Sequence, residues 1–260
     1  MAISSEPFEF DAGMAAPATV LVTHGFTGDP ASMRPWGEHL RAAGFNVVAP
    51  LLPGHGGTWQ DLSRTGWDDW MSEVEQALKR AESFGRPVFA AGLSMGGSLT
   101  LRLAELHQER LRGLVLVNPA IVDSTPHGFL TPFIHRVVPS VGSIGSDIKK
   151  PDKRESTTDR TPLASYASLR RGWKATRRDL DRIHLPMRIF TSVDDHVVSP
   201  RNSAVIRSQV SSTDIVSTSL LHSYHVATLD WDAELIFRQS AEFIRAYSSD
   251  TDSDKELQSG

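Results

Sequence analysis

The chain has 260 residues, of which 40% are hydrophobic and 22% are charged, a composition typical of a globular protein. The formal net charge of −4 gives no indication of a nucleic-acid partner. The absence of cysteine excludes disulfides, thiolate chemistry and metal sites built from cysteine.

The N-terminal stretch MAISSEPFEFDAGMAAPA has neither a basic start nor a long apolar segment. It therefore does not resemble a signal peptide. No apolar run in the sequence reaches the length of a membrane span. We expect a cytoplasmic protein without stable membrane insertion, and the sequence does not indicate its oligomeric state.

Six short apolar runs rich in strand-forming residues are spaced along the chain. Most are continuous rather than alternating, which is typical of strands buried on both faces of a parallel sheet. The runs span residues 19–24, 45–50, 87–92, 113–118, 187–192 and 213–220.

Three further segments carry apolar residues at helical spacing. They span residues 33–43, which Gly44 closes, 67–81, and 236–247 near the end of the chain. Strand and helix patterns alternate, so the sequence predicts an α/β fold with a mostly parallel central sheet flanked by helices.

The alternation breaks between about residues 119 and 185, where proline, glycine and serine are frequent. A structureless loop of that length is improbable within a compact domain, so this segment predicts an inserted cap or lid. The core would then comprise residues 1–118 and 186–247. Residues 248–260 are acidic and poor in apolar residues, and we expect them to be disordered.

The first part of the predicted cap is unusually apolar for an insertion. Its side chains can cover an apolar ligand or pack the cap onto the sheet, and the sequence supports both interpretations. A lid could also touch a lipid surface, although no convincing basic anchor accompanies it. The residues concerned are Ile121, Phe129, Leu130, Phe133, Ile134, Val137 and Val138.

The segment GLSMGG lies between the apolar run 87–92 and a helix-like run. Gly92, Ser94 and Gly96 fit the pattern G-x-S-x-G, in which a serine sits on a sharp strand-to-helix turn and small neighbours avoid clashes. The pattern predicts that Ser94 is a nucleophile. The N–H of Met95 would lie at a helix N-terminus, where it can stabilise an oxyanion.

A serine hydroxyl needs a base and a group that orients the base. In such folds these follow the serine in the order acid, histidine, from loops at the carboxyl ends of later strands. The stretch VDDHVVSP follows the run 187–192 and offers Asp194 and Asp195. We favour Asp195 as the acid because the apolar pair Val197 and Val198 can anchor its loop.

The stretch LHSYHVATLDWD follows the last apolar run and offers two histidines as the base. His222 comes directly after the strand, whereas His225 lies further out in the loop. We favour His225 as the base. Three other histidines, interpreted as loop or packing residues, are His24, His55 and His196.

The second oxyanion donor is expected in the loop after the first long strand, VLVTHGFTGDPASM. Gly25 allows a sharp turn, and the N–H of Phe26 would then face the site. His24 more plausibly fixes this loop by hydrogen bonding. The alternative is an ordinary turn at the end of a strand.

Five motifs, LVTHGFTGDPASM, LLPGHG, GLSMGG, DDHVVSP and SYHVATLD, resemble the α/β-hydrolase superfamily. Within it they look most like the bacterial monoacylglycerol lipase and carboxylesterase group. The likeness extends from Val20 to Tyr247 and is weakest in the cap. GLSMGG alone is widespread, whereas the ordered set of five motifs is much more specific.

The resemblance implies the same site as the residues do: Ser94 as nucleophile, Asp195 as acid, His225 as base, and the N–H groups of Phe26 and Met95 as oxyanion donors. It also implies that the cap forms an acyl-chain tunnel, with Phe129 and Ile134 as candidate binding residues. A cap glutamate of the family helps to hold the glycerol hydroxyls. By position this would be Glu155. The alternative interpretation is that Glu155 is a solvated charge on the cap surface.

The expected activity is therefore hydrolysis of carboxylic esters, most of all monoacylglycerols, through an acyl-serine. This chemistry requires no metal or organic cofactor. Other carboxylesterases and thioesterases share the scaffold, and a ligand-binding protein with low turnover could also retain the triad.

Overall fold

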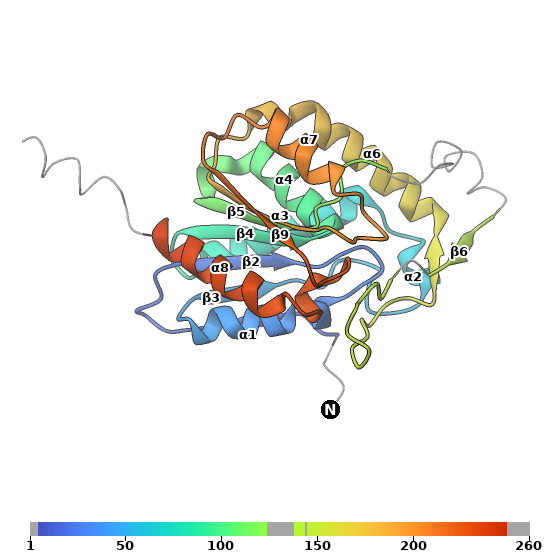
Figure 1. The fold of residues 1–260 in the computed structure, drawn as a ribbon, viewed down its shortest axis with the longest axis horizontal. Coiled ribbons are helices and arrows are strands. Elements are labelled where there is room, and N and C mark those ends of the chain that lie inside the picture. The colour runs from blue at the N-terminus through green and yellow to red at the C-terminus, as the bar shows by residue number, and fades with distance from the viewer. Residues whose placement is uncertain (1–4, 124–137, 144, 249–260) are drawn as a thin grey trace, which may run out of the picture.

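The computed structural model describes residues 5–123, 138–143 and 145–248. Seven strands form one sheet in the order β1-β3-β2-β4-β5-β8-β9 (Figure 1). All neighbouring strands run parallel except β1, which pairs antiparallel with β3. The predicted α/β class with a mostly parallel sheet is confirmed. The strands are β1 (Phe8–Phe10), β2 (Thr19–Thr23), β3 (Asn46–Ala49), β4 (Val88–Leu93), β5 (Gly113–Val117), β8 (Met187–Ser192) and β9 (Ile215–Leu220).

The six predicted apolar runs correspond to strands β2, β3, β4, β5, β8 and β9. Strand β1 was not predicted, because three residues are too few to show a strand period. It lies at the edge of the sheet, with Phe8 opposite Ala49.

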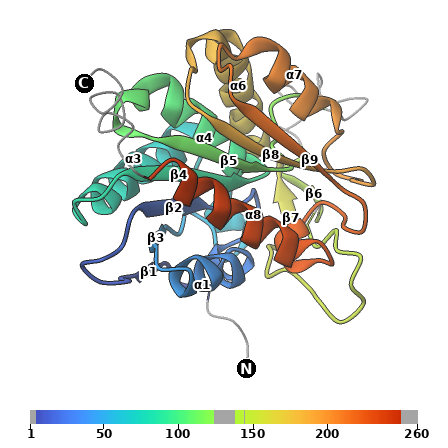
Figure 2. The ribbon, with the colours of Figure 1, turned by 60° about the vertical axis from the view of Figure 1, so that its left-hand side comes forward.

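Helices cover both faces of the sheet (Figure 2). Helices α1 and α8 contact each other on one face, while α3, α4 and α6 pack together on the other. The three predicted helices are α1, α3 and α8. The helices are α1 (Arg34–Ala42), α2 (Trp59–Leu62), α3 (Trp67–Glu82), α4 (Met95–His107), α6 (Leu163–Asp179), α7 (Arg201–Gln209) and α8 (Ala233–Ala246), with short 3₁₀ helices at Pro30–Ser32, Gln108–Arg110, Leu180–Arg182 and Ala227–Leu229.

The central strands are buried on both faces, and their side chains alternate between two hydrophobic clusters. In β4, Val88 and Ala90 face the cluster under α3 and α4, whereas Phe89 and Ala91 face the cluster under α1 and α8. This alternation follows from the two-residue period of a strand. It also explains why the strands are continuous apolar runs.

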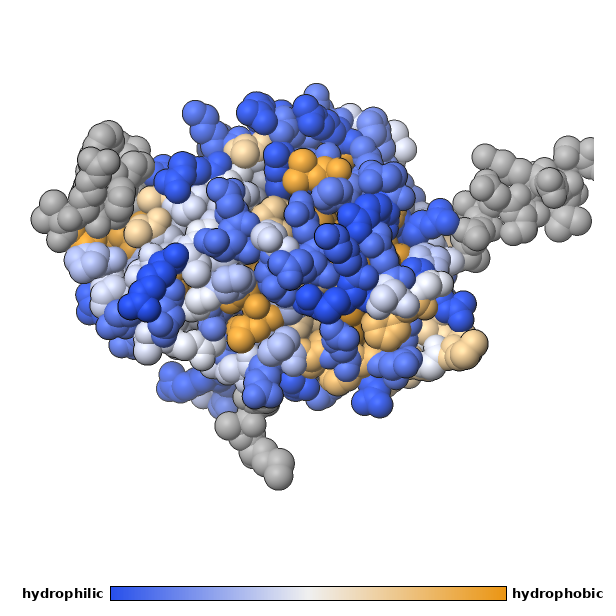
Figure 3. Space-filling model, turned by 180° about the vertical axis from the view of Figure 1, so that it is seen from behind, coloured by the Kyte–Doolittle hydropathy of each residue, from blue (hydrophilic) through white to orange (hydrophobic). Residues whose placement is uncertain are grey.

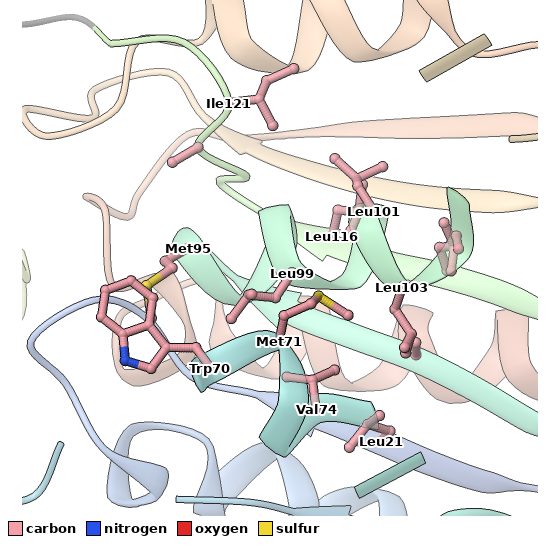
Figure 4. Packing of buried hydrophobic residues seen from close by; sticks show 14 of the residues in the cluster. Leu21, Trp70, Met71, Val74, Met95, Leu99, Leu101, Leu103, Leu116 and Ile121 are labelled. Atoms are coloured by element: carbon pink, nitrogen blue, oxygen red, sulfur yellow. The ribbon is translucent and has the colours of Figure 1, made fainter. Parts of the chain in front are cut away.

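Helices α3 and α4 meet through apolar side chains beside the sheet. Trp70 and Met71 of α3 lie near Met95 and Leu99 of α4 (Figure 4). Full burial of a large apolar side chain contributes roughly 1.5–3 kcal/mol to stability, and Trp70 is completely buried. This packing holds the first residue of α4 firmly in place.

Part of the predicted cap is a small antiparallel pair, β6 (Ser140–Gly142) with β7 (Arg160–Pro162). Helix α6 follows and packs on α3 and α4. It approaches closely at Gly172, where a Cβ would lie 2.0 Å from the ring of Trp67. Residues 163–179, which we placed in the cap, form a helix that lies against α3 and α4.

The apolar cap residues have different surroundings. Ile121 is fully buried in the core cluster, and Val138 is 39% exposed. The candidate binding residues Phe129 and Ile134 lie outside the described residues, as do Leu130, Phe133 and Val137. The predicted tail beyond Ser248 also lies outside them.

Hydrophilic residues cover most of the face shown in Figure 3, with smaller apolar patches between them. Among the described residues, no helix is both long and apolar enough to cross a membrane.

Candidate active site

Ser94 occupies the junction between the central strand β4 and helix α4. Its backbone φ is 55°, in the left-handed region that non-glycine residues rarely adopt. The Ser94 N–H donates to the Val117 carbonyl at 3.0 Å, and the Ser94 carbonyl accepts from the N–H groups of Ser98 and Ala120, each at 3.2 Å. Strain of this kind costs about 1–3 kcal/mol and persists where the surroundings hold it.

The glycines of the motif are required by close backbone contacts. A Cβ at Gly92 would lie 2.3 Å from the carbonyl carbon of Gly96. A Cβ at Gly96 would lie 2.1 Å from the carbonyl oxygen of Thr23 on the neighbouring strand β2. Both distances are far inside van der Waals contact. The small residues therefore allow α4 to begin directly after the carboxyl end of β4, where Ser94 lines a cavity.

His225 and Asp195 come from loops that follow β9 and β8, and they meet in a hydrogen bond. Nδ1 of His225 lies 2.8 Å from Oδ2 of Asp195, and only 8% and 2% of these side chains are exposed. Oδ1 of Asp195 accepts the N–H groups of Val197 at 2.8 Å and Val198 at 2.7 Å. Asp194 is different, since its side chain is 55% exposed. The geometry thus distinguishes the two adjacent aspartates.

Ser94 and His225 line the same small cavity of about 40 Å³. His222 is exposed, and its N–H donates to Asp232. The structure therefore brings Ser94, His225 and Asp195 together and leaves His222 outside. The cavity is lined by Gly25, Phe26, Leu93, Ser94, Gly145, Glu155, Val197, His225 and Val226.

The charge state of His225 is set by opposing effects. Burial lowers the pKa of its imidazole, but the nearby carboxylates of Asp195, Glu155 and Asp147 raise it by more, so that the pKa lies above the ordinary value of 6.5. A raised pKa makes the neutral imidazole a stronger base toward the Ser94 proton.

Glu155 lies between β6 and β7 and reaches the same cavity as Ser94. Its Oε2 accepts the Ser146 N–H at 3.3 Å, and its own N–H donates to the Ser146 hydroxyl at 3.2 Å. Burial raises the pKa of Glu155 to about 7, against the lowering effects of the Ser146 N–H and His225. The structure thus places the predicted glutamate at the site, with a carboxylate that is not fully solvated.

The loop after β2 holds Phe26 at the cavity wall. His24, just before it, is buried. Its Nδ1 donates to the Gly25 carbonyl at 2.9 Å, and its Nε2 accepts the Leu52 N–H at 3.2 Å. A neutral ring fits both contacts, and burial lowers the pKa of His24 to about 4. His24 therefore fixes the loop, as expected from the sequence.

Met95 is the first residue of α4, so its N–H has no acceptor within the helix. The helix dipole adds partial positive charge at this end. A backbone donor in this position, immediately after the half-buried serine, can stabilise negative charge that develops on a bound carbonyl.

Asn118, at the end of β5, is a site residue that sequence reasoning missed. Its φ is 44°. Its Nδ2 donates to the His225 carbonyl at 2.7 Å and to the Ser192 hydroxyl at 3.0 Å, while its Oδ1 accepts the Ser192 N–H at 2.7 Å. It thus joins the ends of β5 and β8 to the histidine loop. Its only signal in the sequence is its place at the end of an apolar run.

Across residues 5–123, 138–143 and 145–248, no group of three or more histidine, aspartate or glutamate side chains is arranged to hold a metal ion.

Comparison with known proteins places this geometry in context. Residues 15–232 match the family described as serine aminopeptidase, S33. A thermostable monoacylglycerol lipase from Bacillus sp. (strain H-257) is 41% identical over 250 residues, which cover 94% of this chain and 96% of the relative. A carboxylesterase from Bacillus subtilis (strain 168) is 28% identical and covers 93% of this chain and 97% of its own length.

Solved structures show the same fold. A structure of the metagenome-derived lipolytic enzymes LipS and LipT matches with a TM-score of 0.89 at 36% identity, over 93% of this chain and 98% of the other. The monoacylglycerol lipase of Paleococcus ferrophilus matches with a TM-score of 0.78 at 21% identity, over 93% and 99% of the two chains.

Proposed function

Because the chain belongs to the S33 family of α/β-hydrolase serine hydrolases, we propose that it hydrolyses carboxylic esters, and monoacylglycerols in particular, to fatty acid and alcohol. The observation that carries this proposal is a single cavity. It is lined by Ser94 and by His225, whose Nδ1 is hydrogen-bonded to buried Asp195. The full-length likeness to a monoacylglycerol lipase supports the choice of substrate.

In the proposed mechanism, Nε2 of His225 takes the proton of Ser94 as Oγ attacks the ester carbonyl. The N–H groups of Phe26 and Met95 stabilise the resulting oxyanion. The tetrahedral intermediate then collapses, His225 protonates the departing glycerol oxygen, and an acyl-serine remains. Asp195 holds the imidazole in the tautomer with a proton on Nδ1 and stabilises the imidazolium.

In the second half of the reaction, His225 removes a proton from water, which attacks the acyl-serine carbonyl. The same two N–H groups stabilise the second oxyanion. Collapse of this intermediate breaks the bond to Oγ, His225 returns the proton to Ser94, and the fatty acid leaves. The balance requires only water and the ester.

The position of Glu155 favours a substrate with a polar head group. Its carboxylate lies in the cavity beside Ser94 and can accept hydrogen bonds from hydroxyl groups of the leaving alcohol. We therefore propose that Glu155 binds the glycerol moiety. A simple alkyl ester would not use this contact, so the residue should contribute to selectivity rather than to the bond-breaking steps.

The decisive experiment is a hydrolysis panel of p-nitrophenyl esters and of mono-, di- and triacylglycerols of increasing chain length, with Ser94→Ala as the control. We expect turnover of monoacylglycerols, little of triacylglycerols, and none by Ser94→Ala. Labelling of Ser94 by a fluorophosphonate without any ester turnover would instead favour a binding protein. Turnover by Ser94→Ala equal to that of the wild type would refute the mechanism.

A second candidate, a carboxylesterase of broader range, is favoured by the likeness to the Bacillus subtilis carboxylesterase. The same panel separates the two. Hydrolysis of short alkyl esters with a higher kcat/KM than any monoacylglycerol would favour the carboxylesterase.

A further inference from the structure

Asp147 binds both loops that carry the proposed acid and base. Its Oδ2 accepts the N–H of His225 and the N–H of His196, each at 3.2 Å. Its Oδ1 lies 2.9 Å from Nδ1 of His196. Its backbone carbonyl accepts the Val226 N–H at 3.0 Å. One residue therefore contacts His225, the residue after it, and the residue that follows Asp195.

Asp147 comes from neither of these loops. It lies in the segment between β6 and β7, 78 residues before His225 and 49 residues before His196. The same segment contains Glu155, which reaches the cavity. The inserted segment thus supplies contacts to the catalytic loops as well as a wall of the site.

A second aspartate makes the connection reciprocal. Asp230, which follows the histidine loop and is fully buried, accepts the N–H groups of Lys149 at 2.7 Å and Lys150 at 3.0 Å. Its Oδ2 also accepts the Tyr224 N–H at 2.9 Å. Asp147 of the inserted segment therefore binds the backbone of the histidine loop, and Asp230 binds the backbone of the inserted segment. The two carboxylates hold the segments in a fixed relation.

The backbone of His225 is hydrogen-bonded through both its carbonyl and its N–H. Asn118 donates to its carbonyl at 2.7 Å, and Asp147 accepts from its N–H. His225 itself lies outside any helix or strand. In reactions of this kind a displacement of about 1 Å can cost roughly 100-fold in rate, so the position of this backbone has direct consequences for the imidazole.

We propose that Asp147 is a positioning residue that aligns His225 and the Asp195 loop for proton transfer. This inference rests on the proposed function, because it assigns the purpose of the alignment to chemistry at Ser94. Asp147 contacts the backbone of His225 and Val226 and both the backbone and the ring of His196, and none of these is a reacting atom. Its removal should slow the chemical step while leaving substrate binding intact.

The test compares Asp147→Ala with Asp152→Ala, which removes an exposed carboxylate from the same segment. We expect Asp147→Ala to lower kcat and the rate of fluorophosphonate labelling of Ser94 by about 10- to 100-fold, with KM within about twofold of the wild type. Asp152→Ala should match the wild type in all three. Asp147→Asn should recover most of the rate, because its amide oxygen can still accept the His225 N–H.

Thermal unfolding of each variant shows whether the protein is folded at the assay temperature. If Asp147→Ala is not folded at that temperature, Asp147→Glu takes its place in the kinetic assays. The longer side chain keeps the charge but cannot place its oxygens on the same N–H groups, so kcat should again fall. Wild-type kcat in folded Asp147→Ala or in Asp147→Glu would overturn the inference, as would equal changes in kcat and KM.

Fluorophosphonate labelling separates this inference from the proposed substrate. Labelling needs an activated Ser94 but no lipid ester, so the difference between Asp147→Ala and the wild type persists if the natural substrate is a different ester. A wild-type protein whose Ser94 is not labelled would refute the proposed function and the positioning role together. A labelled wild type with equally fast labelling of folded Asp147→Ala would refute the positioning role alone.

Discussion

A side chain at position 28 and the carboxylate of Glu155 cannot occupy the same space. A Cβ built on Gly28 lies 2.6 Å from Oε1 of Glu155. Gly28 has no positive φ, so alanine is compatible with its backbone. Gly28→Ala should therefore displace the Glu155 side chain and weaken glycerol binding. Hydrogen bonds to charged groups contribute roughly 1.5–3 kcal/mol, so we expect KM for a monoacylglycerol to rise about 10-fold or more.

The substrate itself provides one control, since p-nitrophenyl butyrate has no glycerol group and its KM should change little. The control variant is Gly142→Ala, where a Cβ would meet no atom within 4 Å. An equal rise of KM for both substrates would show that Gly28→Ala disturbs the whole cavity, and Glu155 would lose its role in selectivity.

Asp195→Asn should lower kcat by about 10³- to 10⁴-fold, as expected when the base is held in the wrong tautomer. The amide oxygen can still accept the N–H groups of Val197 and Val198, so the loop should keep its shape. The amide NH₂ would face Nδ1 of His225, which would then have to be unprotonated. Measurement of kcat by a continuous ester assay checks this.

Asp194→Asn is the matched control, because it changes the neighbouring carboxylate by the same single group. The Asp194 side chain is 55% exposed and lies 3.5 Å from Nε2 of His196. We expect kcat within about twofold of the wild type, since exposed ion pairs contribute little. A larger loss in Asp194→Asn than in Asp195→Asn would reverse the proposed roles.

The parts of the fold that could be predicted from the sequence are those with a strong local signal. Short apolar runs predicted the six strands that run parallel to one another, and the G-x-S-x-G pattern located the turn at Ser94. The difference between Asp195 and Asp194 also follows from local residues, because the N–H groups of Val197 and Val198 donate to the carboxylate of Asp195.

Long-range contacts had no comparable signal. Asp147 lies in a polar stretch of the insertion, and nothing local indicates that its carboxylate meets loops 49 and 78 residues further on. Asn118 likewise acts through contacts 74 and 107 residues away. Helix α6 was assigned to the cap because it lies where the alternation of strand and helix patterns breaks, and nothing local indicates that Gly172 fits closely against Trp67.

Glu155→Gln should extend activity to lower pH. The base must be neutral to act, so kcat/KM falls as pH drops through the pKa of His225, which lies above 6.5. The carboxylates near this ring are Asp195, Glu155 and Asp147, and each favours the imidazolium while it is ionised. Removing the charge of Glu155 lowers the pKa of His225, and the acid limb of the kcat/KM profile should move to lower pH.

The profile is best measured with p-nitrophenyl butyrate, because this substrate makes no use of a glycerol contact. Asp152→Asn is the control, since Asp152 is exposed and is not among the groups that affect the His225 pKa. A shift of the acid limb to higher pH in Glu155→Gln would contradict the electrostatic coupling between the two side chains.

His24 should make the protein less stable in mild acid. Its folded-state pKa is about 4, below the ordinary value of 6.5, because burial disfavours the charged ring. The unfolded chain therefore binds more protons between these values, and stability is lost as pH falls from 6.5 toward 4. Between pH 7 and pH 5 this residue should lower the free energy of unfolding by about 2 kcal/mol.

Urea unfolding of the wild type and of His24→Gln at both pH values checks the contribution of His24. Other groups titrate in the same range. Glu155, whose folded pKa is raised to about 7, acts in the opposite direction because its stabilising effect is lost as pH rises. The difference between the two proteins isolates His24: the variant should be less stable at pH 7, having lost the bonds to Gly25 and Leu52, but should lose about 2 kcal/mol less on acidification. Equal losses in the two proteins would mean that His24 does not remain neutral in the folded state.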